Sequence, residues 1–377
     1  MKVYLDNAAT TKIHPKVIDA MMPYLTEHYG NPSSVHSFGR KARVAIEDSR
    51  EIIAEFINAD PSEIYFTSGG TEATNFIING IAKTEFLESG KNRIITSAGD
   101  HKATLNSIEN LVLNGFQSTI LPLDKNFKII SKSENNASLS SIVHVNNETG
   151  TINNIKEINS AFENSYFHTD AVQSFGKIKI DVEELGLHAL SASAHKLNGP
   201  KGIGIAYVKS GTPMSSIILG GGQERNRRAG TENTASIVGF AEAVKIAKEN
   251  LDDNFNKVKK LKDYLWNGLV AKNIEGITNN SFADSSPFIL SITLSPEIYN
   301  NDSESILMFL DINEVAVSSG SACASGTLKP SHVILAAGYS KEYANGTIRF
   351  SFSPNNTIEE LDYTIDVMKK LTEKFRK

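Results

Sequence analysis

Residues 64–83 read IYFTSGGTEATNFIINGIAK, and this stretch predicts a strand, a glycine turn and a helix in that order. The strand is a short run at 64–68 that is rich in β-branched and aromatic residues, and residues 71–83 form the helical segment. Short strands alternate with amphipathic helices in the same way from about residue 40 to residue 250, with a helix at 37–57 and strands at 93–98, 141–147, 165–170 and 187–193. This alternation is typical of an α/β fold in which helices cover a mostly parallel sheet.

The pattern changes after a long charged helix that begins near Leu251. A strand at 287–294, a further helix, a segment of small residues, a strand at 346–352 and a final helix follow. We therefore predict a large α/β domain over residues 12–250 and a smaller α+β domain built from residues 1–11 and 251–377. Residues 131–140 (SKSENNASLS) are polar and predict a loop.

The composition is that of an ordinary soluble globular protein, with 40% hydrophobic and 21% charged residues. The net charge of −5 argues against bulk nucleic-acid binding. The N-terminal stretch MKVYLDNAATT lacks the features of an export signal, and no run of about 18 apolar residues occurs, so we expect neither export nor membrane insertion. A single cysteine permits neither an internal disulfide nor a multi-cysteine metal cage, and the nine histidines lack metal-site spacing. A cytoplasmic protein without a metal centre is expected.

Cys323 is that single cysteine, and it lies in the stretch SSGSACASGT. The stretch has neither helical nor alternating apolar periodicity, which favours an exposed loop where a thiolate can react. The alternative is a small buried hydrophobic side chain, the commoner state of a free cysteine.

Three features of the predicted α/β domain point together to a cofactor site. Ser68, Gly69, Gly70 and Thr71 form a strand-to-helix turn whose backbone N–H groups suit a phosphate, although a plain turn with a cap is an alternative. Asp170 ends a strand, where its carboxylate can pair with a protonated ring nitrogen or cap a helix. Lys196 follows a strand 26 residues later and can form a Schiff base, whereas most lysines are solvated surface residues. Their joint occurrence indicates a pyridoxal phosphate site.

Three further side chains have chemistry that suits such a site. His101 can stack on a planar ring and shuttle protons, and Asn146 can hydrogen-bond a substrate or ring oxygen. Arg349, on a strand of the smaller domain, can grip a carboxylate in bidentate fashion. The alternative for His101 and Asn146 is a satisfied polar residue or turn former, and for Arg349 it is a surface arginine. The basic loop GGGQERNRRAG lacks interleaved aromatics, and GPKGIG lacks the spacing of a dinucleotide fingerprint, so neither indicates nucleic-acid or dinucleotide binding.

Six motifs together resemble the cysteine desulfurases, fold-type I pyridoxal phosphate enzymes of the class V aminotransferase group. They are GNPSSVHSFGR, HTDAVQSFGK, SASAHKLNGPKG, GGGQERNRRAGTEN, SSGSACASGTLKPSH and GTIRFS, and they span nearly the whole chain in the family's order. The resemblance implies an aspartate aminotransferase-like large domain with a smaller C-terminal domain, and a homodimer with shared active sites.

The resemblance also implies roles for individual residues. Lys196 would carry the cofactor as a Schiff base, Asp170 would pair with its pyridine nitrogen, Gln173 would bond its phenolic oxygen and His101 would stack on its ring. The phosphate would be bound by Gly70, Thr71, Ser193, His195 and Thr231, the last from the other subunit. The substrate would be held by Asn146, Arg349 and Asn31. Cys323 would take the sulfur as a persulfide, with His101 a candidate proton acceptor.

The reaction implied is the conversion of L-cysteine to L-alanine, with the sulfur passed from Cys323 to an acceptor protein. Three acceptors are compatible with the resemblance: an iron-sulfur scaffold, a tRNA-thiolation carrier or another sulfur relay. With a scaffold, Cys323 would be a candidate transient ligand of the cluster. Scaffold-docking relatives often carry a tail beyond the last helix, whereas this sequence ends in LTEKFRK, which leaves scaffold docking open. A selenocysteine lyase, an aminotransferase and a non-enzymatic protein of the same fold are the alternatives.

Overall fold

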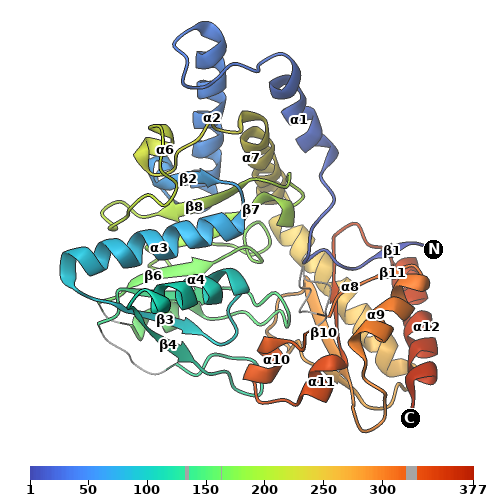
Figure 1. Ribbon diagram of the computed structural model, residues 1–377. Helices are drawn as coiled ribbons and strands as arrows, with labels where there is room; N and C mark the ends of the chain where they lie inside the picture. The colour runs from blue at the N-terminus through green and yellow to red at the C-terminus, as the bar shows by residue number, and fades with distance from the viewer. Residues whose placement is uncertain (132–135, 163, 320–328) are drawn as a thin grey trace.

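The structure is a computed structural model that describes residues 1–131, 136–162, 164–319 and 329–377. Its central feature is a seven-stranded sheet (Figure 1). In spatial order the strands are β2 (Ile64–Thr67), β8 (Gly204–Val208), β7 (Ala189–Ser193), β6 (Tyr166–Asp170), β5 (Leu139–Val143), β3 (Arg93–Ser97) and β4 (Gln117–Leu121). β8 runs antiparallel to both of its neighbours, and the other pairs are parallel. The predicted α/β fold with a mostly parallel sheet is confirmed.

Helices cover both faces of this sheet. One face is covered by α3 (Gly70–Ser89) and α4 (Lys102–Leu113), and the other by α1 (Pro15–Thr26), α2 (Ser37–Phe56), α5 (Ile155–Ser160) and α7 (Thr234–Glu249). Successive strand residues enter opposite cores, as Ile94 packs under α3 and α4 while Ile95 packs on the other side. Both faces of the strands are therefore buried, which explains their apolar runs.

A second group of elements forms around the end of the chain. β9 (Ile277–Asn279), β10 (Ile289–Leu294) and β12 (Thr347–Ser351) make an antiparallel sheet, and β1 (Val3–Tyr4) pairs with β11 (Val315–Ala316). The long helices α8 (Leu251–Ala271), α9 (Ser303–Ile312) and α12 (Ile358–Phe375) share one apolar core with these strands and with Leu5. Val3 and Leu5 thus belong to this core, and the predicted division into two domains stays a prediction.

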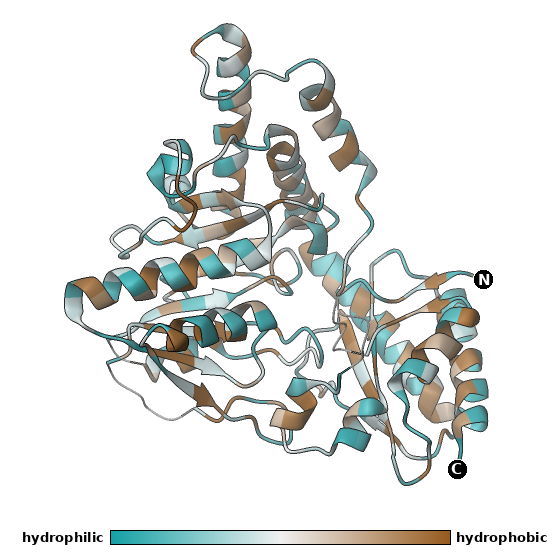
Figure 2. Ribbon diagram, in the orientation of Figure 1, coloured by the Kyte–Doolittle hydropathy of each residue, from teal (hydrophilic) through white to brown (hydrophobic). Residues whose placement is uncertain are grey.

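The helices have the expected amphipathic character. α12 begins with a capping box between Thr357 and Glu360 and buries Leu361, Ile365 and Met368 at helical spacing. Figure 2 shows hydrophilic and hydrophobic residues on alternate sides of the covering helices. The short helices are α6 (Gln223–Asn226), α10 (His332–Ala336) and α11 (Lys341–Asn345), with 3-10 turns at Pro61–Glu63 and Ala194–Lys196. No helix in the described part of the chain has the length and apolar character needed to cross a bilayer.

Both predicted boundaries of β5 were wrong. The strand predicted at 141–147 ends at Val143, because the chain turns where the Asn146 side chain accepts hydrogen bonds from the N–H groups of Glu148 and Thr149. The same strand starts at Leu139, inside the predicted loop 131–140, because Leu139 is buried and pairs with both β3 and β6.

Candidate active site

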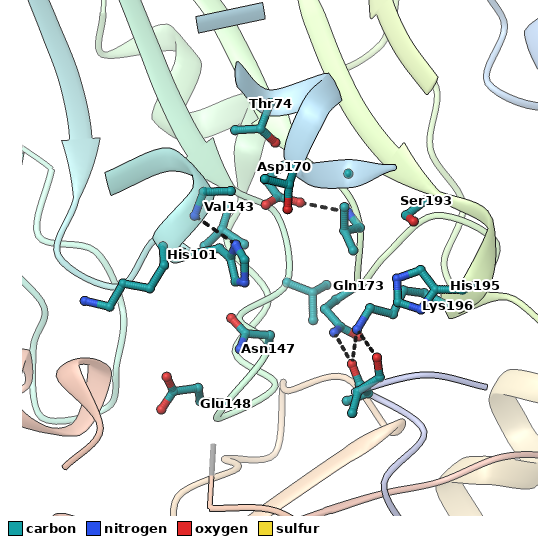
Figure 3. A pocket seen from close by; sticks show the side chains of 18 of the residues that line it. Thr74, His101, Val143, Asn147, Glu148, Asp170, Gln173, Ser193, His195 and Lys196 are labelled. Atoms are coloured by element: carbon teal, nitrogen blue, oxygen red, sulfur yellow. Dashed lines mark hydrogen bonds between the residues drawn. The ribbon is translucent and has the colours of Figure 1, made fainter. Parts of the chain in front are cut away.

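A cavity of about 380 Å³ opens beyond the carboxyl ends of β5, β6 and β7 (Figure 3). Its walls come from the first turns of α3 and α4, the strand ends, the N-terminal segment and the second group of elements. It is lined by Ala8, Ala9, Gly70, Thr71, Thr74, His101, Lys102, Ala103, Val143, Val145, Asn147, Glu148, Asp170, Val172, Gln173, Ser193, His195, Lys196, His332 and Arg349. The cavity therefore lies where open α/β sheets bind ligands.

The glycine turn predicted from the sequence forms one wall. β2 ends at Thr67, α3 begins at Gly70, and no side chain caps the helix. A Cβ on Gly70 would lie 2.6 Å from Val172, so only glycine lets the two segments approach this closely. The uncapped N–H groups of the first turn remain for an anion. Ser193 and His195 also line the space beside this turn.

Asp170 is the last residue of β6 and is nearly fully buried. Its Oδ1 accepts a hydrogen bond from the N–H of Val172 at 2.9 Å. Burial raises the pKa of this carboxyl, although the nearby charges of His101 and Lys196 oppose the rise. A carboxylate in this position is stabilised by a cationic N–H group in the cavity, and a protonated pyridine nitrogen is such a group.

Lys196 lies in the turn after β7, and its amine points across the cavity (Figure 3). The Nζ atom donates hydrogen bonds to the carbonyl oxygens of Ala8 and Ala9. Burial and the positive charge of Arg349 lower the pKa of Lys196 to about 8, so the neutral amine is accessible near physiological pH. An amine of this kind is a suitable nucleophile for an aldehyde.

His101 and His195 are held in defined orientations. His101 caps α4, with its Nδ1 accepting from the N–H of Ala103 at 3.1 Å, so its ring is fixed at the cavity wall. The Nδ1 atom of His195 lies 3.2 Å from Oγ1 of Thr10. Burial and three nearby lysines lower the pKa of His195 to about 4, which keeps that ring neutral.

Arg349 lies on β12, in the three-stranded antiparallel sheet, and its side chain lines the cavity. Its Nη1 donates to the carbonyl of Asn147 at 2.7 Å, and its Nη2 donates to Asp6 at 2.9 Å and to Ser318 at 2.6 Å. The Nε–H group is buried and has no hydrogen-bond partner among the residues that the structure describes. A buried guanidinium with an unused N–H fits an anionic ligand such as a carboxylate.

The sequence matches a known protein family over nearly its whole length. A model of the aminotransferase class-V family matches residues 3–364. The chain belongs to the aminotransferase class-V family. Among its curated relatives, the protein named cysteine desulfurase IscS from Dictyoglomus turgidum is 43% identical, over 100% of this chain and 95% of the relative. The protein of the same name from Clostridium botulinum (strain Hall) is 41% identical, with the same coverage.

Solved structures agree with this family membership. A structure titled "NIFS-LIKE PROTEIN" superposes with a TM-score of 0.88 at 35% identity and covers 99% of both chains. One titled "SspA in complex with cysteine" has a TM-score of 0.80 at 33% identity and covers 95% of this chain and 100% of its own. The similarity therefore extends over both groups of elements in this class-V chain.

Not every residue predicted for the site lines the cavity of this class-V protein. Asn146 is buried but directs its amide to the carbonyl of Gly99 at 2.9 Å, and its neighbour Asn147 lines the cavity instead. Asn31 is exposed, and its side chain accepts from the N–H of Ser33. Thr231 is exposed and away from the cavity. The predicted roles of these three residues stay predictions.

Cys323 lies outside the described residues. The described residues on either side of 320–328 do contact the class-V site, since Ser318 accepts from Arg349 and the Ser331 hydroxyl donates to Glu148. Ser318 and Ser331, which flank this segment in the sequence, thus lie beside the cavity.

Sequence reasoning missed Asn147, Glu148 and His332. Nδ1 of His332 lies 3.6 Å from Glu148, and its Nε2 is 3.0 Å from the carbonyl of Asp100. The polar run NNETG and the histidine that ends LKPSH were the available signals. Among the described residues, no group of three or more His, Cys, Asp or Glu side chains is arranged to hold a metal ion.

Proposed function

We propose that this class-V protein is a pyridoxal phosphate-dependent cysteine desulfurase. It would convert L-cysteine to L-alanine and transfer the sulfur to Cys323 as a persulfide. The observation that carries the proposal is that Lys196, Asp170 and Arg349 line one cavity. They supply a nucleophilic amine, a buried carboxylate and a guanidinium whose Nε–H has no partner among the described residues. Relatives named cysteine desulfurase, at 41–43% identity over the full chain, support the choice of reaction.

The residues fit pyridoxal phosphate at its phosphate group and at its ring nitrogen. The uncapped start of α3, with Gly70 and Thr71, would hold the phosphate together with Ser193 and His195. Asp170 would hold the ring nitrogen in its protonated form. When bound, pyridoxal phosphate supplies an aldehyde that condenses with amines and a ring that accepts electrons from the α-carbon of an amino acid.

Lys196 would be the amine that the cofactor engages, and its freed Nζ would then accept the α-proton of the substrate. The lowered pKa of Lys196, about 8, suits both tasks, because each requires the neutral amine. His101, fixed as the cap of α4, would stack on the cofactor ring and serve in proton transfer at the sulfur. Gln173 would donate its amide N–H to the phenolic oxygen.

Arg349 would bind the substrate carboxylate through its unpartnered Nε–H. Asp6 and Ser318 hold the same guanidinium from its Nη2 end, so the group needs little rearrangement when the carboxylate arrives. The remaining predicted substrate contacts are Asn146 and Asn31. Asn147, which lines the cavity, is a more direct candidate than Asn146 in this arrangement.

The sulfur transfer balances without an external oxidant. The Cβ–S bond of the substrate breaks, and a new S–S bond forms to the sulfur of Cys323. The electron pair of the broken bond stays with the carbon, which takes up a proton, so the products are alanine and a Cys323 persulfide. The contacts of Ser318 and Ser331 with Arg349 and Glu148 support access of this segment to the cavity.

The assembly and the destination of the sulfur extend the proposal. A homodimer would bring Thr231, exposed in the single chain, to the phosphate of the neighbouring subunit. The persulfide would be passed in the cytoplasm to an acceptor protein, an iron-sulfur scaffold or another sulfur carrier. Relatives that carry the name IscS support a cluster-assembly acceptor.

The test measures alanine and protein-bound persulfide formed from L-cysteine by the pyridoxal phosphate-loaded protein and by its Cys323→Ala variant. We expect both products with the wild type, and neither above background with the variant, whose visible absorbance should be unchanged. Loaded wild type that forms no alanine would overturn the desulfurase assignment. Alanine with undiminished persulfide in the variant would remove Cys323 from the proposal.

A further inference from the structure

Lys177 is a buried lysine that the mechanism above does not use. It follows β6, is 7% exposed, and does not line the main cavity. Its Nζ donates to Oε1 of Gln173 at 3.2 Å and lies 5.5 Å from the ring centroid of Phe288. Together with Lys196 it lines a separate small cavity of about 50 Å³ behind the site.

A buried cation in this place is costly. Burial, and then the positive charges of Lys196 and Arg349, lower the pKa of Lys177 to about 7. A methionine of similar shape would fill the same space without this cost. The lysine therefore calls for an explanation beyond packing, and its contact with Gln173 supplies one.

Gln173 is held at both ends of its amide. Its Nε2 donates to the carbonyl of Ala8 at 2.9 Å, the same carbonyl that accepts from Lys196, and its Oε1 accepts from Lys177. Figure 3 shows Gln173 and Lys196 converging on this carbonyl. The Lys177 amine carries N–H bonds in either protonation state, and its donation to Oε1 keeps the amide oxygen on its own side. The Ala8 carbonyl can only accept, so it keeps the amide nitrogen toward itself and the cavity.

An amide nitrogen carries two N–H bonds, and the bond to Ala8 uses one. We propose that Lys177 is a positioning residue that holds Gln173 in the orientation in which the remaining N–H meets an acceptor oxygen in the cavity. The acceptor is an anionic oxygen on a planar ring, as on pyridoxal phosphate, and to this extent the inference rests on the proposed function. If the amide were reversed, its oxygen would face both that anion and the Ala8 carbonyl.

The experiment measures the dissociation constant and the absorption maximum of pyridoxal phosphate bound to wild type, Lys177→Met and Lys177→Gln. Methionine removes the donor, while glutamine keeps an amide donor without the charge. The matched control is Lys262→Met, because Lys262 is also buried, has a pKa lowered to about 8, bonds Ser285 and the carbonyl of Ser286, and does not line the main cavity.

We expect Lys177→Met to weaken cofactor binding roughly tenfold and to shift its absorption maximum, as expected for the loss of one hydrogen bond to a charged group. Lys177→Gln should stay within about threefold of wild type, and Lys262→Met should match wild type. Equal binding by wild type and Lys177→Met overturns the inference, and so does an equal loss in the Met and Gln variants, which would assign the effect to charge or packing.

Lys177→Met leaves the Gln173 oxygen unpaired and can impair folding for that reason alone. The double variant Gln173→Leu/Lys177→Met removes both polar groups, and its comparison with Gln173→Leu decides the question. If Lys177 acts through Gln173, the second substitution causes no further loss of affinity, and an additional tenfold loss contradicts the proposal. Wild type that binds no pyridoxal phosphate would instead refute the proposed function.

Discussion

Arg349 and Asp6 form an ion pair of 2.9 Å between β12 and the N-terminal segment, 343 residues apart in sequence. The arginine side chain is 4% exposed and the aspartate side chain 20% exposed. The pair orients the guanidinium, whose Nε–H has no partner in the described part of the chain. A cation that is held in place by one carboxylate and has a buried donor to spare is prepared for a second carboxylate.

The first prediction concerns this guanidinium. Arg349→Lys keeps the positive charge and loses the planar fork, so we expect the KM for L-cysteine to rise by one to two orders of magnitude, the equivalent of about 1.5–3 kcal/mol. The visible absorbance of the bound cofactor should be unchanged. Steady-state alanine formation checks this, and an unaltered KM would show that another residue binds the carboxylate.

The second prediction concerns the proton on Lys196. Only the neutral amine attacks an aldehyde, so the rate at which the apo-protein captures pyridoxal phosphate should rise with pH and level off above about 8. The negative charge of Asp6 raises the pKa of Lys196, and the positive charge of Arg349 lowers it. Asp6→Asn should therefore move the midpoint to lower pH and Arg349→Gln to higher pH. Stopped-flow absorbance measures both, and shifts of the same sign would contradict this electrostatic account.

The third prediction concerns acid stability. His168 is fully buried between Ser141 and Ser191, and burial lowers its pKa from 6.5 to about 3. The unfolded chain binds this proton below pH 6.5 and the folded chain does not. The stabilisation is therefore complete above pH 6.5 and is lost as the pH falls toward 3, at up to about 1.4 kcal/mol per pH unit.

His168→Gln keeps polar atoms for both serines and does not titrate. The free energy of unfolding of this variant should fall less steeply between pH 6.5 and 4 than that of wild type, as measured by urea unfolding at several pH values. Buried His144, with a pKa lowered to about 4, contributes equally to both proteins and cancels in the difference. Parallel curves would be the contrary result.

The fourth prediction concerns the loop GGGQERNRRAG. Glu224 accepts from Arg50 at 2.8 and 2.9 Å and from the N–H of Phe66 at 2.8 Å, and both side chains of the ion pair are 2% exposed. Glu224→Gln should destabilise the protein by up to about 3–5 kcal/mol, because it removes the buried charge that pairs with Arg50 and leaves that guanidinium only the part-exposed Glu47. The control Glu55→Gln breaks the exposed pair with Lys248 and should leave the unfolding midpoint unchanged. Equal midpoints for all three proteins would show that the buried pair contributes little.

Much of the site could be predicted from the sequence, because the parts that carry most chemistry are local. Gly70 follows a strand and opens a helix, Asp170 ends a strand, and Lys196 follows one. Parallel strands present their carboxyl ends at the same edge of a sheet, so these residues had to lie near one another once the α/β pattern was recognised. The error at the end of β5 arose because the Asn146 side chain accepts hydrogen bonds from the N–H groups of Glu148 and Thr149 and so forms a turn that ends the strand.

The sequence by itself therefore determined the fold class, the cofactor-type turn and the positions of the amine and the acid, since strand and helix periodicity fix which residues stand at strand ends. Only the tertiary structure decided which side chains complete the cavity. Arg349, Asp6 and Ser318 meet because β12, the N-terminal segment and the end of β11 pack together, and no local pattern encodes that contact. The same holds for Gln173, whose hydrogen bond to the Ala8 carbonyl joins segments 165 residues apart. A buried polar group can bond only the partners that packing brings within reach. Hydrogen bonds over such separations therefore depend on how the apolar cores of the seven-stranded sheet and of the second group of elements pack together.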